Sequence, residues 1–128
     1  KLLERLRFPM NIDYVHATRY RGKTTGTELQ WERAPSIDLS GRVVIVVDDI
    51  FDEGVTLKGV VERCELLGAD KVHTVVLVNK LHERKVMNFS CDLVGLEVED
   101  RYVYGSGMDY RGYFRNVAGI YAVSDLDK

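Results

Sequence analysis

The stretch Val43-Val-Ile-Val-Val47, followed by Asp48-Asp-Ile-Phe-Asp-Glu-Gly-Val-Thr56, decides the fold of this chain. Five consecutive β-branched residues are typical of a strand in a parallel sheet that is covered on both faces. We expect the acidic pair to end this strand. From residue 56 to residue 67 apolar side chains recur at helical spacing, and Gly68 is the expected stop. The stretch therefore predicts a strand, a loop and a helix, in that order.

The chain after this helix continues the same pattern. Residues 72–78 form a second apolar run, which predicts a buried strand. A strand, a helix and a second strand imply parallel pairing through a right-handed crossover. Residues 93–98 and 119–123 are short and strand-like. The fold class is therefore α/β, with one open and mostly parallel sheet flanked by helices.

The chain before this stretch predicts a hairpin appended to the sheet. Residues 11–20 and 27–33 are expected to be its strands, and the polar, glycine-bearing segment 21–26 its mobile tip. Residues 1–7 are expected to be the tail of an amphipathic helix that Pro9 stops. Because the chain opens on this tail, we expect residues 1–128 to be a single domain that lacks its N-terminal segment.

Composition limits the classes of protein to consider. The 128 residues are 45% hydrophobic and 30% charged, as expected of one globular domain. No apolar run approaches the ~20 residues that a membrane helix needs. The net charge of −2 gives no indication of nucleic-acid binding. Cys64 and Cys91 lack metal-binding spacing, so we expect reduced thiols and a cytoplasmic protein.

Ligands of open parallel sheets lie beyond the carboxyl ends of the strands, where this chain has its acidic string. Carboxylates at a buried strand end are costly unless they bind hydroxyl groups, cations or a metal. Gly54 permits a tight turn, and Thr56 can cap the following helix, whose N-terminus favours anions. A sugar phosphate is the ligand that fits both halves. An acidic pair alone is equally compatible with a simple turn or helix cap, whereas the whole string is much more specific.

Residues Val44 to Thr56 resemble the phosphoribosyl pyrophosphate (PRPP) signature of type I phosphoribosyltransferases. This resemblance implies that Asp48 and Asp49 hold the ribose hydroxyls. It also implies a 5′-phosphate loop made of Asp52, Glu53, Gly54, Val55 and Thr56. The signature usually has a small residue at the position of Glu53, so we expect that side chain to point away from the phosphate.

Residues 92–115 resemble the hypoxanthine-guanine branch of the same family, and the resemblance extends from about Pro9 to Val123. An aromatic-Val pair, a glycine, Asp-Tyr and Tyr-Phe-Arg recur there at this spacing. The resemblance implies a purine site formed by Lys80, Tyr102, Val103 and Asp109. It further implies Mg²⁺ as cofactor, with Asp109, Asp48 and Asp49 as its ligands, and Arg115 as the pyrophosphate contact.

The chemistry of these residue types agrees with such a site. Tyr102 offers a flat face on which a purine can stack. Lys80 follows a strand and can only donate, so it favours a 6-oxo purine over a 6-amino purine. Taken singly, each of these residues is more simply a core tyrosine or a surface charge. Their joint occurrence in order supports the site.

Residues 13–26 resemble the mobile loop that closes over the site in this family. The eukaryotic enzymes have Ser-Tyr where this chain has Arg19 and Tyr20, so Tyr20 is the expected closing residue. His16, His73 and His82 show no metal-binding pattern. We expect His73 to lie in a strand, and the other two to face solvent.

The resemblance implies transfer of phosphoribose from PRPP to a 6-oxopurine, with Asp52 as general base near N7 of the purine. It also implies a homodimer or homotetramer, with no nucleic-acid or membrane partner. One alternative is a PRPP-sensing regulator of the same fold that binds nucleic acid. Another is a receiver-type signalling domain, but the strand ending at Asn79 and Lys80 lacks the second aspartate that such a domain needs.

Overall fold

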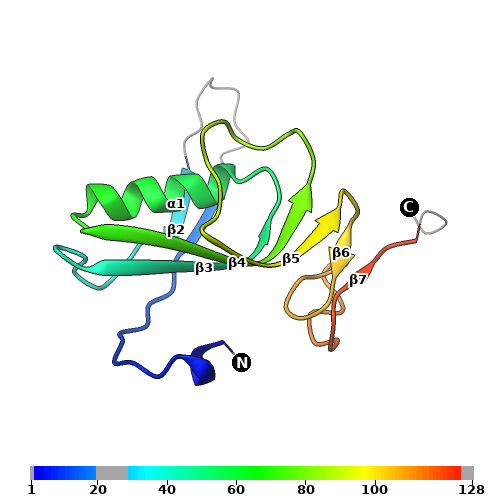
Figure 1. Cartoon of the computed structure of the whole chain (residues 1–128), viewed down its shortest axis with the longest axis horizontal. Helices are drawn as coiled ribbons and strands as arrows, with labels where there is room; N and C mark the ends of the chain where they lie inside the picture. The colour runs from blue at the N-terminus through cyan, green and yellow to red at the C-terminus, as the bar shows by residue number, and fades with distance from the viewer. Residues whose placement is uncertain (1, 20–28, 125–128) are drawn as a thin grey trace. The chain divides into compact units, whose positions relative to one another are not determined.

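The computed structural model describes residues 2–19 and 29–124, and it divides into two compact units, residues 1–38 and 39–128 (Figure 1). Within these residues, no helix is long and apolar enough to cross a membrane. Each unit is described by itself below.

The first unit is an antiparallel hairpin preceded by one helical turn. Strand β1 (His16–Arg19) pairs with β2 (Leu29–Arg33), which confirms the predicted hairpin. The predicted amphipathic helix is only a 3₁₀ turn, η1 (Leu3–Arg5). The first strand begins later than predicted because Asp13 accepts hydrogen bonds from the backbone of Tyr14, Ser36 and Ile37. These bonds join the chain before β1 to the chain after β2.

The second unit contains a parallel sheet of order β3-β4-β5, and all three predicted strands and their parallel pairing are confirmed. The strands are β3 (Val43–Phe51), β4 (Lys71–Leu81) and β5 (Leu93–Glu99). Helix α1 (Val55–Leu66) connects the first two and matches the predicted helix. Figure 1 shows α1 lying along one face of β3 and β4.

Strand β3 runs past Asp48, where the sequence predicted its end. It continues to Phe51 because β4 extends past that point and pairs with it there, Ile50 lying opposite Val78 and Phe51 opposite Asn79. The prediction of a strand covered on both faces is also wrong for the described residues. Only one face of β3 packs against α1, and Val43, Ile45 and Val47 are exposed.

Two apolar clusters fix the end of the sheet near the acidic string. In the first, Phe51 and Val76 of the sheet pack with Leu57 of α1. In the second, Val78 packs with Val103 and Met108. Val103 belongs to a small antiparallel ribbon of β6 (Val103–Tyr104) and β7 (Tyr121–Ala122). The predicted strand at 119–123 is therefore shorter than expected, and it pairs in the ribbon and not in the parallel sheet.

Candidate active site

A pocket of about 270 Å³ lies at the carboxyl ends of β3 and β4. The chain of β3 and the residue that follows it supply Asp49, Ile50 and Asp52, and β4 supplies Lys80. The remaining wall comes from the segment after β5, with Tyr102, Val103, Met108, Asp109 and Arg115. Two sequence motifs about fifty residues apart thus converge on one pocket, as the two resemblances required.

Asp52 is bonded through both of its carboxylate oxygens. Its Oδ2 accepts a hydrogen bond from the Lys80 ammonium at 3.0 Å, and its Oδ1 lies 2.6 Å from His82 Nε2. Desolvation alone would raise the pKa of Asp52, but the bonds from Lys80 and His82 outweigh it and lower the pKa below its ordinary value. Asp52 is therefore a carboxylate acceptor near neutral pH.

Lys80 is not a solvated surface lysine, because only 11% of its side chain is exposed. It lines the pocket from the penultimate position of β4, beside the end of β3. Among the described residues, its hydrogen-bond partner is the Asp52 carboxylate. An ammonium with one partner keeps two donor hydrogens for a ligand.

Asp48 and Asp49 form an acidic pair near the end of β3, and their charges repel each other. Asp48 accepts the backbone N–H of Asp49 at 2.9 Å. Desolvation, together with the charge of Asp49, raises the pKa of Asp48 to about 6. Only Asp49 lines the pocket directly. A pair of this kind is relieved by hydroxyl donors or by a cation, and carboxylate oxygens are ligands that Mg²⁺ accepts.

The predicted 5′-phosphate loop leads into the start of α1. Gly54 is the N-cap residue, with a φ of 82°, and a side chain there would run into the ring of Phe51. The helix begins at Val55, so Thr56 lies inside the first turn and is not the cap, contrary to the prediction. The first amides of a helix have no acceptor within it, and they attract anions.

The segment after β4 donates hydrogen bonds to the backbone carbonyls of this loop. The Lys85 ammonium donates to the carbonyl oxygens of Phe51 and Asp52, and it lies 4.0 Å from the centre of the Phe51 ring. The Val86 N–H donates to the Glu53 carbonyl at 2.8 Å. These bonds hold the backbone of the loop in place from its carbonyl side.

The purine wall and the pyrophosphate wall meet at β6 and the loop that follows. Tyr102 is 48% exposed, which suits a stacking platform better than a core residue, and the Tyr110 ring packs edge-on against it at 5.7 Å. Val103, the next residue, is buried and packs against Val78 and Met108. Arg115 lies 2.6 Å from the Asp109 carboxylate and also donates to the Gly107 carbonyl. The predicted metal ligand and the predicted pyrophosphate contact are therefore paired with each other.

The expected closing loop is described only in part. Arg19 is the last residue of β1, whereas Tyr20 lies outside the described residues. The role of both residues stays a prediction.

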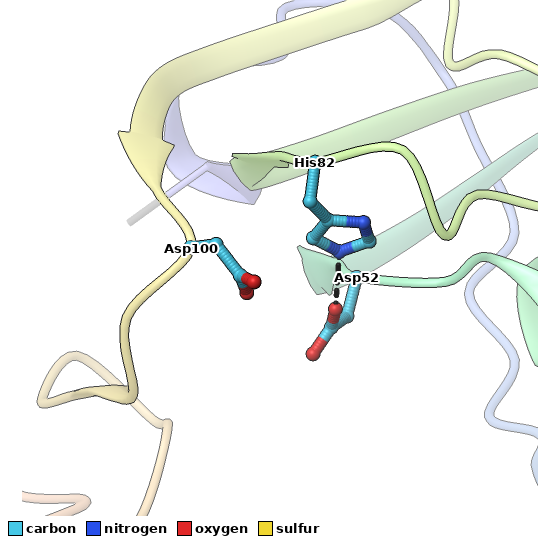
Figure 2. A group of neighbouring side chains, drawn as sticks. All are labelled: Asp52, His82 and Asp100. Carbon is cyan, nitrogen blue, oxygen red and sulfur yellow. Dashed lines mark hydrogen bonds and ion pairs between the residues drawn. The ribbon is translucent and has the colours of Figure 1, made fainter.

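His82 is the residue that the sequence analysis missed. It was expected to face solvent, but only 4% of its side chain is exposed, and Figure 2 shows its ring over the Asp52 carboxylate. The sequence carried no clear signal for it, because His82 lies just beyond the end of β4 and its partners come from Asp52 and from the turn at Arg84.

Asp100 completes a cluster with Asp52 and His82 whose ligand atoms lie within 4.8 Å of one another. Asp100, however, is bound through two hydrogen bonds by Arg84, and Asp52 is bound by Lys80. Two cations thus already balance the two carboxylates. The cluster is better described as a hydrogen-bond network than as a metal centre.

Comparison with known proteins agrees with this geometry. The phosphoribosyl transferase domain family matches residues 1–111, and the chain belongs to that family. A curated relative, the hypoxanthine-guanine phosphoribosyltransferase of Aquifex aeolicus, is 30% identical over 115 residues. That match covers 89% of this chain and 64% of the relative, so the chain spans just under two thirds of its length.

Two solved structures show the same fold. A hypoxanthine phosphoribosyltransferase from Staphylococcus aureus has a TM-score of 0.87 at 28% identity, over 96% of this chain and 67% of that one. A hypoxanthine-guanine phosphoribosyltransferase from Bacillus anthracis also has a TM-score of 0.87, at 26% identity, over 96% of this chain and 72% of that one. The fold is that of the type I phosphoribosyltransferases, as the sequence predicted.

Proposed function

We propose that this chain transfers the phosphoribosyl group of PRPP to N9 of hypoxanthine or guanine, giving IMP or GMP and pyrophosphate. The observation that carries this proposal is the single pocket lined by Asp49 and Asp52 of one motif, by Lys80, and by Tyr102 and Arg115 of the other. The names of the relatives from Aquifex aeolicus and Bacillus anthracis support the same activity.

The PRPP half of the proposed site is the end of β3 and the start of α1. Asp48 and Asp49 accept hydrogen bonds from the ribose hydroxyls, which relieves the repulsion within the pair. The amides at the start of α1 receive the 5′-phosphate, and Gly54 makes the required turn. The Glu53 carbonyl accepts a hydrogen bond from the Val86 N–H. Residue 53 therefore contributes to the phosphate loop through its backbone and not through its carboxylate.

Of the three predicted Mg²⁺ ligands, Asp49 and Asp109 line the pocket, and Mg²⁺ commonly takes one or two protein carboxylates and shares its remaining sites with phosphates and water. Bound Mg²⁺ would neutralise charge that develops on the pyrophosphate leaving group. Arg115 contributes a second positive charge on the same side of the pocket. It must first exchange its Asp109 partner for the ligand.

The purine half is formed by Tyr102, the Val103 backbone and Lys80. The exposed Tyr102 ring stacks on the purine, and the Lys80 ammonium donates to the 6-oxo group. A 6-amino group would present a second donor to Lys80 and leave both unpaired, which disfavours adenine.

Asp52 accepts the proton that N7 carries as N9 attacks the sugar. The transition state resembles an oxocarbenium ion, so catalysis consists mainly of positioning and charge stabilisation. When Lys80 moves to the 6-oxo group, Asp52 loses a contact that lowers its pKa, so its basicity increases as the purine binds. Arg19 and Tyr20 would then close over the ligands and exclude water.

The proposal extends to the setting of the protein. Two free cysteines suit a reducing compartment, and we propose a cytoplasmic enzyme that acts as a homodimer or homotetramer.

The test is a steady-state assay of the purified full chain with PRPP, Mg²⁺ and each of hypoxanthine, guanine, xanthine and adenine. The proposal predicts nucleotide and pyrophosphate in equal amounts from hypoxanthine or guanine, and far less from adenine. PRPP-dependent binding of RNA in a mobility-shift experiment, without any turnover, would favour the regulator instead.

A further inference from the structure

The His82 ring is nearly free of water, and one of its nitrogens lies within 4.8 Å of carboxylate oxygens of both Asp52 and Asp100 (Figure 2). In contrast, 43% of the Asp52 side chain is exposed and faces the pocket. His82 is therefore placed behind Asp52, where it can act on that carboxylate without touching a ligand.

Both ring nitrogens of His82 have assigned partners. Nδ1 receives the backbone N–H of Arg84 at 3.1 Å, and Nε2 lies 2.6 Å from Asp52 Oδ1. A backbone N–H can only donate, so Nδ1 must carry a lone pair. A carboxylate oxygen can only accept, so Nε2 must carry the proton. These two contacts together are compatible with one form only, the neutral Nε2–H tautomer.

We infer that His82 is a positioning residue, fixed in the Nε2–H tautomer, that holds the Asp52 carboxylate in one orientation. The inference rests on the proposed function, in which Asp52 accepts the purine proton. Of the two Asp52 oxygens, His82 holds Oδ1 and Lys80 holds Oδ2. When the purine takes the Lys80 ammonium, Oδ2 becomes available while Oδ1 stays held by the buried ring.

The contacts of the neighbouring residues hold the His82 ring in this orientation. Arg84, whose N–H faces Nδ1, is anchored by two hydrogen bonds to Asp100 at 2.7 and 3.0 Å. Lys85 and Val86 tie the same segment to the backbone of the phosphate loop. The charged groups around the ring are Asp52 after β3, Asp100 after β5, and Lys80 and Arg84 of its own segment. A tautomer so enclosed determines the direction of its carboxylate partner.

The tautomer is tested without any turnover, by ¹⁵N NMR of the imidazole groups in the purified full chain. The chain has only three histidines, so His16→Phe and His73→Phe variants assign the His82 signals. His16 is an internal reference, because there it is Nδ1 that lies against a carboxylate, that of Glu32 at 2.9 Å. We expect the Nε2–H pattern for His82 at neutral pH. An Nδ1–H or an averaged pattern would overturn the inference.

Kinetics test the positioning role. His82→Phe keeps a ring but removes the donor, and we expect kcat to fall by on the order of 10- to 100-fold while KM for hypoxanthine and PRPP changes little. His82→Gln retains an N–H near the Nε2 position and should recover much of kcat. His73→Phe, which removes a histidine of β4 that does not line the pocket, is the control and should leave kcat unchanged.

The two claims fail in different ways. If His82→Phe keeps wild-type kcat, or if the Gln variant is no better than the Phe variant, the positioning role is wrong even though the enzyme turns over. If the wild-type protein does not turn over PRPP and hypoxanthine, the proposed function fails. The NMR measurement still tests the tautomer of His82, because it does not depend on turnover.

Discussion

Lys80 and Asp52 are hydrogen-bonded at 3.0 Å across the pocket, from the ends of neighbouring parallel strands. In the proposed mechanism both have a role toward the purine, Lys80 toward its 6-position and Asp52 toward N7. Without a ligand, the Lys80 ammonium and the Asp52 carboxylate are hydrogen-bonded to each other. This avoids leaving a partly buried charge unpaired. In the proposed mechanism the Lys80 ammonium turns from Asp52 to the 6-oxo group, so the choice of base is coupled to the release of the general base.

Replacing Lys80 by Gln tests the choice of base. Gln can offer a carbonyl or an amide, so it no longer penalises a 6-amino group, and the unpaired-donor penalty of ~1–3 kcal/mol is relieved. We expect lower kcat/KM for hypoxanthine and guanine, and a smaller gap to adenine, at saturating PRPP and Mg²⁺. An oxopurine-to-adenine ratio equal to that of the wild type would show that Lys80 does not read the 6-position.

Asp48→Ala and Asp49→Ala test the ribose contacts. Each variant loses charge-assisted hydrogen bonds worth ~1.5–3 kcal/mol, so PRPP affinity should fall by about 10- to 100-fold in calorimetric titration with Mg²⁺. Glu65→Ala, an exposed acidic residue on α1, is the charge-matched control and should bind PRPP normally. Unchanged affinity in both aspartate variants would remove the ribose assignment.

Gly54→Ala tests the geometry of the phosphate loop. Gly54 and Gly41 both have positive φ, but a side chain meets the Phe51 ring only at Gly54. Both alanine variants should carry the left-handed strain of roughly 1–2 kcal/mol in urea unfolding, and Gly54→Ala should lose more. Only Gly54→Ala should also weaken PRPP. Equal effects of the two variants on stability and on PRPP affinity would contradict the role of Phe51 in shaping this turn.

The contacts of Asp13 predict that the free energy of unfolding of the first unit decreases at acidic pH. Hydrogen bonds from the backbone of Ser36 and Tyr14 lower the pKa of Asp13 from 3.8 to about 2. A lowered folded-state pKa contributes stability above the unfolded value, and this stability is lost as pH falls through about 4 toward 2. In Asp13→Asn, circular dichroism of denaturant unfolding should show a flatter pH dependence in that window. A curve parallel to that of the wild type would rule out the contribution.

The sequence predicted the parts of this protein whose local pattern and tertiary role agree. The run from Val43 to Val47 and the helix after Gly54 are consistent at both levels, and their parallel pairing followed. The end of β3 was misplaced because the length of β4 decides it, and no local signal at Asp48 reports that length. Cover on only one face of the sheet likewise depends on which segments pack there, which no strand pattern encodes.

The candidate site shows the same division. Residues with a motif, such as Asp49, Lys80 and Arg115, were found because their order along the chain is informative. His82 carries no motif, and a lone histidine after a strand is ordinarily exposed. Its role depends on the approach of Asp52 from a different strand and of the Arg84 N–H from the following turn. Only the folded chain brings these three groups together.

The most direct test of the account is turnover by the wild-type protein and by Asp52→Asn, with PRPP, Mg²⁺ and hypoxanthine. Asn keeps the shape of Asp52 but is a much weaker proton acceptor, and a general base contributes about 10²–10⁴-fold. We predict IMP and pyrophosphate from the wild type, and a loss of kcat of that size in the variant with PRPP binding retained. A variant that keeps more than about a third of wild-type kcat would contradict the role of Asp52 on which the mechanism depends.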